Sequence, residues 1–213
     1  MIKEKKSTNA PTSLLATKLY NGDDVYAQLL EDQHEKCYIC ERKLVTDYEV
    51  EHFKSENNYP ELVQEWTNLF LACGYCNRRK SDSFDDNINP LTTNVEKEIS
   101  QRIDFGLNKA IFETSVADVQ HNNTVRMLNL FYNGKGGKKL RKKKEERFFD
   151  YAKQKVIGFM KIVNDYLMHP TEINRNIVVE ELGIDKELLG FKYWIIRDYN
   201  LNEIFKNNII WNK

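Results

Sequence analysis

The chain has 213 residues, of which 41% are hydrophobic and 30% charged, a composition typical of a folded globular protein. Its 32 Lys and Arg residues balance its 32 Asp and Glu residues, so no strong overall attraction to nucleic acid is expected. The sequence has no apolar run near the roughly 18 residues of a membrane span, and its basic start lacks the apolar core of a signal peptide. We therefore expect a cytoplasmic protein with no membrane partner, in which residues 1–11 form a disordered arm.

The elements predicted first along the chain are helices within residues 12–36, interrupted at residues 21–24. Residues 43–53 and 66–72 are rich in β-branched and aromatic residues and predict two strands, and residues 76–82 predict the start of a short helix. After a loop around Pro90, residues 92–213 predict a helical extension. Its clearest helical periodicity lies in residues 138–168, which Pro170 ends, and Thr171 can cap the next helix. The predicted fold is α+β and mostly α.

Four cysteines form two CxxC pairs, Cys37 with Cys40 and Cys73 with Cys76. In a reducing compartment this arrangement favours a metal over disulfides, because two short turns can aim four thiolates at one Zn²⁺ ion. A redox-active CxxC is the alternative, but that chemistry needs one pair in a βαβ setting, which the sequence does not indicate. His34, three residues before the first pair, is a remote substitute ligand. A zinc ion held by four cysteines has no open position for water and is predicted to be structural.

The segment between and after these pairs carries a more specific pattern. It reads "CYICER", then "EVEHF", then "WTNLFLACGYCNRRKSDSFDDNINPL". The pattern resembles the HNH endonuclease family, and within it the PtuB-type HNH subunits of bacterial Septu and retron-associated anti-phage systems. The resemblance covers residues 37–91. It implies a ββα-metal nuclease core held together by a four-cysteine zinc, preceded by N-terminal helices (12–36) and followed by the helical extension (92–213), which is predicted to be the docking region for a partner.

The resemblance also implies roles for individual residues. Phosphodiester hydrolysis needs a base for water, and His52 is the candidate because a neutral imidazole titrates near ambient pH. Glu51 and the side-chain oxygen of Asn77 are the candidate ligands for a catalytic Mg²⁺ or Mn²⁺. Asn68 matches the family asparagine that holds the loop between the strands. The commonest pattern has Asp where this chain has Glu51, so Glu49, two residues earlier on the same strand face, is the reserve ligand.

Basic residues after the motif suggest contacts with DNA phosphates, although each can also be an ordinary surface charge. Residues 134–147 hold eight Lys and Arg against two Glu, which indicates either a phosphate-contacting patch or the solvated start of a helix. The candidates are Arg78, Arg79, Lys80, Lys138, Lys139, Arg141 and Lys142.

The resemblance implies DNA as substrate and a PtuA-like ATPase subunit of the ABC/SMC type as partner, and the even charge balance fits a nuclease delivered by another protein. The function predicted from sequence is therefore a metal-dependent DNA endonuclease in anti-phage defence. Two alternatives stay open. One is a zinc-stabilised module that binds nucleic acid or protein without catalysis, and the other is a nuclease that cuts RNA.

Overall fold

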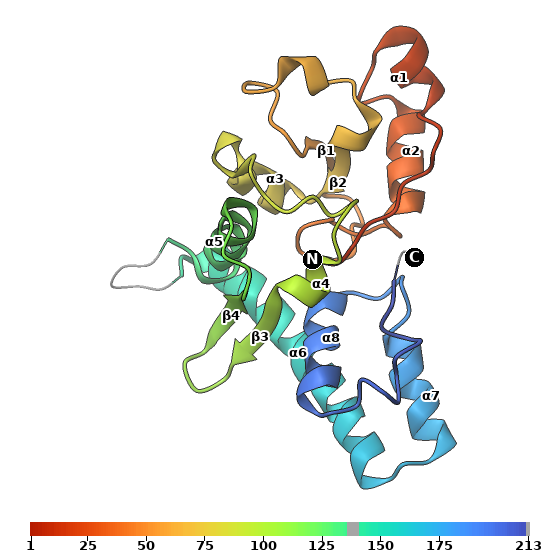
Figure 1. The fold of residues 1–213 in the computed structure, drawn as a ribbon, viewed down its shortest axis with the longest axis vertical. Coiled ribbons are helices and arrows are strands. Elements are labelled where there is room, and N and C mark those ends of the chain that lie inside the picture. The colour runs from red at the N-terminus through yellow and green to blue at the C-terminus, as the bar shows by residue number, and fades with distance from the viewer. Residues whose placement is uncertain (136–140, 212–213) are drawn as a thin grey trace.

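The computed structural model describes residues 1–135 and 141–211. A central helix lies between an N-terminal and a C-terminal half (Figure 1). The first half contains, in chain order, α1 (Thr12–Thr17), α2 (Asp23–Asp32), β1 (Glu49–His52), η1 (Pro60–Leu62), η2 (Trp66–Asn68), β2 (Leu69–Ala72), α3 (Gly74–Lys80) and η3 (Asp82–Phe84). The remainder contains α4 (Val95–Glu98), β3 (Ser100–Asp104), β4 (Lys109–Glu113), the central α5 (Val119–Asn133), α6 (Lys143–Met168), α7 (Glu172–Glu181) and α8 (Leu189–Asp198).

The hairpin of β1 and β2 is the structural centre of the first half. The strands are antiparallel, with Glu51 opposite Phe70 and His52 opposite Leu69. All four residues of β2 are buried, and the ring of Phe70 stacks on that of Tyr38 with centroids 4.6 Å apart. Two strands alone bury too little surface to be stable, so this hairpin depends on the elements packed on it. β2 leads directly into α3, which brings the start of that helix beside β1.

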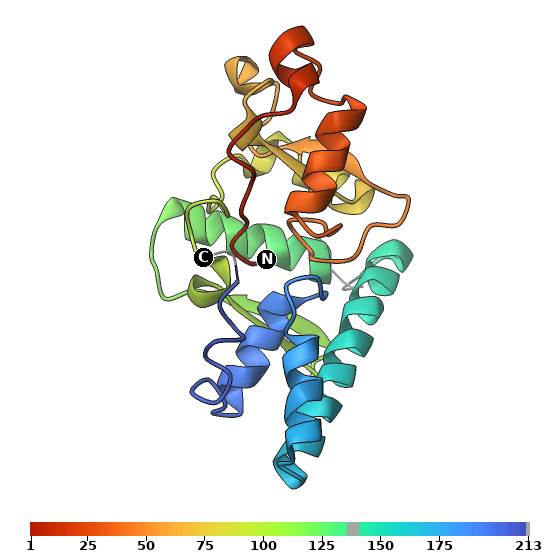
Figure 2. The ribbon, with the colours of Figure 1, turned by 90° about the vertical axis from the view of Figure 1, so that its right-hand side faces the viewer.

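The N-terminal segment differs from the disordered arm that its composition predicts. Met1, Ile2 and Glu4 are buried, and the segment runs as an extended strap from the first half to the middle of the molecule (Figure 2). The backbone N–H of Glu4 donates to the carbonyl of Pro90 at 2.8 Å, and the Lys6 ammonium lies 3.5 Å from the centre of the Trp66 ring. The prediction of disorder rested on the low hydrophobicity of this segment. Backbone hydrogen bonds and a cation–π contact hold the segment in place instead.

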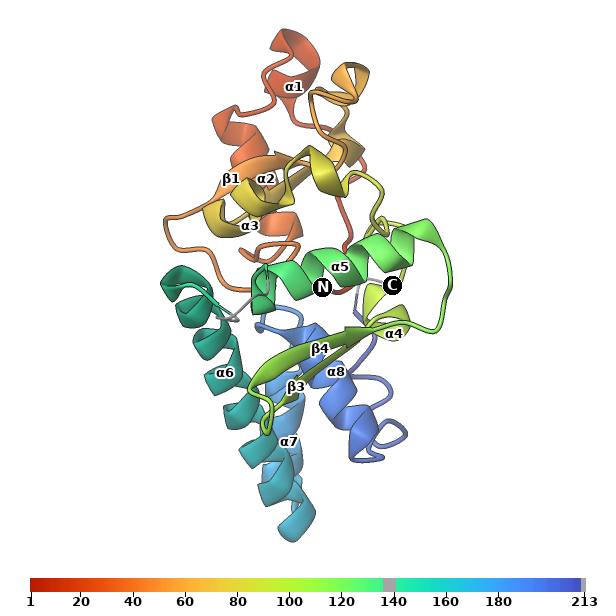
Figure 3. The same ribbon diagram turned by 90° about the vertical axis from the view of Figure 1, so that its left-hand side faces the viewer.

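The C-terminal region contains a second hairpin, which the prediction of a helical extension missed. β3 and β4 pair antiparallel and pack between α5 and α8 (Figure 3). Ala110 and Phe112 of β4 are buried and alternate with less buried neighbours. Five residues of alternation are too short a signal to separate a strand from a loop by sequence. In the part of the chain that the structure describes, two such hairpins among eight α-helices confirm the α+β class.

The helix ends in this region follow local sequence signals. Asp118 caps α5 by accepting the N–H of His121, and Thr171 caps α7 by accepting the N–H of Asn174, as predicted. α6 lies within the stretch of predicted periodicity and buries one face that includes Phe149, Val156 and Phe159. Among the described residues no helix combines the length and apolar character of a membrane span.

His121 joins α5 to α4 and predicts a pH dependence of stability. Its Nδ1 lies 2.8 Å from Asp118 and its Nε2 2.6 Å from Glu98. Burial alone would lower the pKa of His121, but the two carboxylates outweigh it and raise the pKa above its ordinary value. A group whose pKa is higher in the folded than in the unfolded state stabilises the fold when it is protonated. This stabilisation is complete at pH values below the unfolded-state pKa and is lost as the pH rises through the folded-state pKa.

We therefore expect His121→Gln to lower the free energy of unfolding by on the order of 1 kcal/mol near pH 5.5 and by less near pH 8.5. Urea denaturation at both pH values measures this difference. The exposed His169, replaced in the same way, is the control. A loss for His121→Gln that is equal at both pH values would contradict the proposed ion pairs.

Candidate active site and metal centres

The four cysteines meet in one buried cluster. Their sulfur atoms all lie within 4.8 Å of one another, and the sulfurs of Cys40 and Cys73 are 3.9 Å apart. Four sulfurs at about 2.3 Å from a tetrahedral Zn²⁺ would be about 3.8 Å apart, so the cluster has the size that this ion needs. His34 is not part of it. The metal site predicted from the two CxxC pairs is thus assembled from parts of the chain that are distant in sequence.

The electrostatics of this cluster also favour a cation. Burial raises the pKa of the Cys40 and Cys76 thiols well above the ordinary value. The pKa of Cys73 moves the other way and is lowered, because the neighbouring thiols of Cys37, Cys40 and Cys76 stabilise its thiolate. Cys73 also caps α3, where its sulfur accepts the N–H of Cys76 at 3.4 Å. Four buried thiolates would repel one another strongly, so a bound divalent cation is needed to hold them deprotonated.

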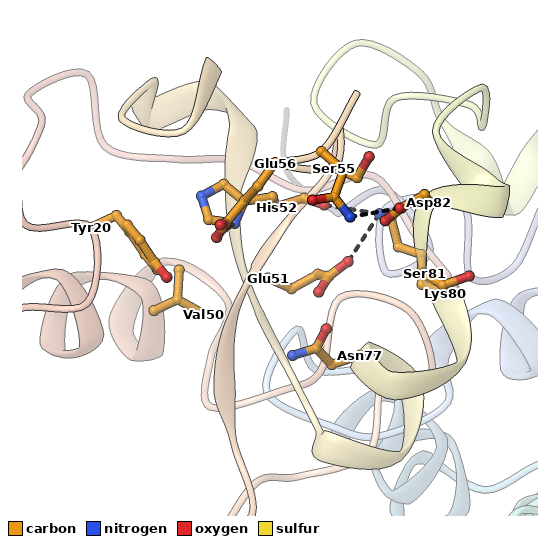
Figure 4. Close-up of a pocket in the computed structure, with 11 residues that line it drawn as sticks. Tyr20, Val50, Glu51, His52, Ser55, Glu56, Asn77, Lys80, Ser81 and Asp82 are labelled. Carbon is orange, nitrogen blue, oxygen red and sulfur yellow. Dashed lines mark hydrogen bonds and ion pairs between the residues drawn. The ribbon is translucent and has the colours of Figure 1, made fainter. Parts of the chain in front are cut away.

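A pocket of about 340 Å³ lies between β1, the loop after it and α3. Glu51, His52 and Asn77 all line it, together with Lys80 and Glu56 (Figure 4). The structure therefore brings the predicted base and both predicted metal ligands to one place. The other residues that line it are Tyr20, Val50, Ser55, Asn57, Ser81 and Asp82.

The imidazole of His52 is buried and held from two sides. Its Nε2 lies 3.0 Å from the carbonyl oxygen of Val63, and because a carbonyl only accepts, Nε2 carries the hydrogen. Nδ1 faces the carboxylate of Glu56 at 3.0 Å, and the ring of Tyr20 packs edge-on at 4.7 Å between centroids. The Glu56 carboxylate, like the carbonyl, can only accept a hydrogen bond. Nδ1 is therefore the atom that can take a proton from a group in the pocket, but only when Glu56 has moved away from it. Glu56 follows His52 by four residues, but neither Glu56 nor Tyr20 belongs to the motif residues that the sequence indicated.

Glu51 lies beside a buried cation. The Lys80 ammonium, whose side chain is 1% exposed, is 2.9 Å from a Glu51 carboxylate oxygen and donates to the backbone carbonyl of His52 at 2.8 Å. Burial raises the pKa of Glu51 to about 7, although Lys80 opposes this shift. Lys80 thus holds Glu51 and the end of β1 from inside the fold, at the edge of the pocket, and its predicted phosphate contact stays a prediction.

Asn77 enters the pocket from the first turns of α3. Its side-chain nitrogen donates to the carboxylate of Glu49, and its oxygen is turned toward Glu51 (Figure 4). Carboxylate and amide oxygens are the ligands that Mg²⁺ and Mn²⁺ prefer, so Glu51 and Asn77 fit such an ion. Glu49, the reserve ligand, does not line the pocket.

Asn68 stands outside the pocket, and its side chain bonds to the backbone at both ends of one loop. Its side-chain oxygen accepts the N–H of Lys54 at 2.7 Å, and its nitrogen donates to the carbonyls of Lys54 and Leu62. Lys54 and Leu62 flank the loop that carries Glu56. These bonds suit the loop-holding role that the resemblance implies.

The predicted phosphate contacts fall into different environments. The side chain of Arg78 is 65% exposed, and Lys142 is exposed at the start of α6. Arg79 forms an ion pair with Glu145 and lies over the ring of Tyr75. Lys138 and Lys139 lie outside the described residues.

Arg141 is a predicted phosphate contact that the structure places inside the fold. Its side chain is buried against Phe149, with the guanidinium carbon 3.5 Å from the ring centroid. It donates to the carbonyls of Tyr132 and Asn108 and to the side-chain oxygen of Asn133. These donors hold the end of α5 and are not available to DNA.

Comparisons with known proteins agree with this geometry. Residues 37–83 match the family described as HNH endonuclease. The chain is also 35% identical to the Septu protein PtuB of Bacillus thuringiensis over 91 residues, a match that covers 35% of this chain and 35% of that protein. The chain therefore matches only about a third of the length of this relative. No solved structure matched. The predicted resemblance to HNH nucleases of the PtuB type is confirmed.

Proposed function

We propose that the chain is a metal-dependent HNH endonuclease that hydrolyses DNA phosphodiester bonds in a bacterial anti-phage defence system. The observation that carries this proposal is the shared pocket of Glu51, His52 and Asn77 beside the cysteine cluster. A base and two oxygen ligands in one cavity are the groups that hydrolysis assisted by one metal ion requires. The match to the HNH family over residues 37–83 supports the same conclusion.

Each group in the pocket has a distinct task in this mechanism. His52 takes a proton from the attacking water at Nδ1, because its Nε2–H is held by the carbonyl of Val63. Glu51 and Asn77 would hold Mg²⁺ or Mn²⁺, and such an ion would supply positive charge to neutralise the phosphate and the departing oxygen. Glu56 now lies against Nδ1, but its side chain is 49% exposed, so it has room to turn aside for water.

The cysteine cluster has a mechanical task. Zn²⁺ on Cys37, Cys40, Cys73 and Cys76 would tie the first CxxC pair to the start of α3. Asn77 follows Cys76 directly, while His52 lies on the strand that pairs with β2. A bound zinc ion therefore sets the distance between the two arms of the pocket.

We further propose that the nuclease works in a complex with a PtuA-like ATPase. Support comes from the relative named Septu protein PtuB and from the zero formal net charge, which leaves DNA affinity to another subunit. The end of the α6–α7 pair also exposes apolar side chains of the kind that partner surfaces use. These are Leu167, Met168, Ile173 and Ile177. Gel filtration of the two co-expressed proteins tests the complex, and separate elution would reject it.

A second candidate function is a zinc-stabilised binding module without catalysis. It is favoured by one observation: His52 and Glu51 both already contact a charged side chain, the carboxylate of Glu56 and the ammonium of Lys80 respectively. Plasmid DNA incubated with the protein and Mg²⁺, Mn²⁺ or EDTA, with and without the ATPase, separates the two functions. Cleavage that requires the divalent ion supports the nuclease, and inert protein under all conditions supports the binding module. Single-stranded RNA in a parallel reaction tests the RNA-cutting alternative.

A further inference from the structure

The side chain of Asn77 can bind a cation in only one of its two orientations. The amide carries an oxygen that accepts and a nitrogen that only donates, and the two have nearly the same shape. A half-turn of the group would present N–H groups to Glu51 and the metal. Whatever sets this orientation therefore decides whether Asn77 is a ligand.

The contact with Glu49 sets it. A carboxylate of Glu49 accepts from the Asn77 nitrogen, and an ionised carboxylate cannot donate to the oxygen if the amide turns over. Glu49 is itself held, because its other oxygen lies 3.4 Å from the Arg78 guanidinium. Arg78 follows Asn77 on α3, so Glu49 of β1 contacts two consecutive residues of the helix.

We infer that Glu49 is a positioning residue that orients Asn77 and is not itself a metal ligand. This inference rests on the proposed function, in which Asn77 binds the catalytic ion. Glu51 and Asn77 line the pocket whereas Glu49 does not. Both oxygens of Glu49 are already used by side chains of α3. Partners that orient metal ligands typically contribute 10- to 100-fold, in order of magnitude, to metal affinity.

A reversed pair, in which positions 49 and 77 exchange the carboxylate and the amide, tests the inference. Aspartate is a common Mg²⁺ ligand, so Asn77→Asp would be harmless if position 77 acted alone. Because the new aspartate would face Glu49 without a donor between them, we expect this variant to bind Mn²⁺ about 10- to 100-fold more weakly. In the double variant Glu49→Gln with Asn77→Asp, the new glutamine donates to the new aspartate, and we expect affinity to return to within about threefold of wild type. Mn²⁺ titration followed by electron paramagnetic resonance measures the affinity, and plasmid cleavage is the second readout.

Alanine variants supply the matched control. If Glu49 acts only through Asn77, Glu49→Ala weakens Mn²⁺ binding in the wild-type chain but has no further effect in Asn77→Ala. An equal loss in both backgrounds, or no rescue by the reversed pair, would overturn the inference while wild-type cleavage leaves the proposed function standing. A wild-type chain that neither binds Mn²⁺ nor cuts DNA would overturn both. Thermal melting of each variant checks that it is folded.

Discussion

Replacement of His52 by alanine is expected to lower the rate of plasmid cleavage by roughly 10²- to 10⁴-fold, the usual contribution of a general base. The side chain lines the pocket with Glu51 and Asn77, and its Nδ1 is the nitrogen left to take a proton. The same change leaves the carbonyl of Val63 without its donor, which should cost about 1–3 kcal/mol of stability. Single-turnover cleavage rates, zinc content and thermal melting of the variant measure these effects.

The control for this variant is His169→Ala, because His169 is exposed at the end of α6 and far from the pocket in sequence. It should cleave at the wild-type rate. The His52 variant should keep its bound zinc, since the cysteine cluster does not include the imidazole. Cleavage by His52→Ala within about tenfold of wild type would be too fast for a missing general base, and would require another residue in that role.

Removal of zinc is expected to unfold the nuclease core. Structural zinc contributes about 10–16 kcal/mol in zinc-finger peptides, as much as the whole stability of a typical domain, about 5–15 kcal/mol. The cluster joins the CxxC pair of Cys37 and Cys40 to α3, and the hairpin between them has only four residues per strand. Chelation, or Cys76→Ser, should therefore abolish cleavage and remove the high-temperature unfolding transition of the core.

The C-terminal half should respond less to the loss of zinc. Its own buried cluster joins α6, α7 and α8 through residues such as Phe159, Val178 and Ile196. We expect far-ultraviolet circular dichroism to fall only in part and to recover on addition of Zn²⁺ but not of Mg²⁺. Metal analysis should find one zinc per chain before chelation. A metal-free protein with an unchanged melting temperature would show that the cysteines form an apolar core without a metal.

The sequence by itself determined the features that depend on neighbours along the chain. Two CxxC pairs predicted a four-sulfur cluster because a short turn places both of its thiols on one side, and the cysteines meet accordingly. The caps of α5 and α7 likewise depend on Asp118 and Thr171 within three residues of the N–H that each accepts. The long periodicity of α6 indicated its buried face for the same reason.

Only the tertiary structure decided the roles of charged residues whose partners are distant in sequence. Lys80 and Arg141 read as surface charges, yet both are buried, because the carbonyl and carboxylate oxygens that compensate them come from other segments. Glu49 and Glu51 lie two residues apart on one strand, but Glu51 contacts Lys80 while Glu49 contacts Asn77. A charge is stable in the interior only beside a partner, and packing of the whole chain, not the local pattern, supplies that partner.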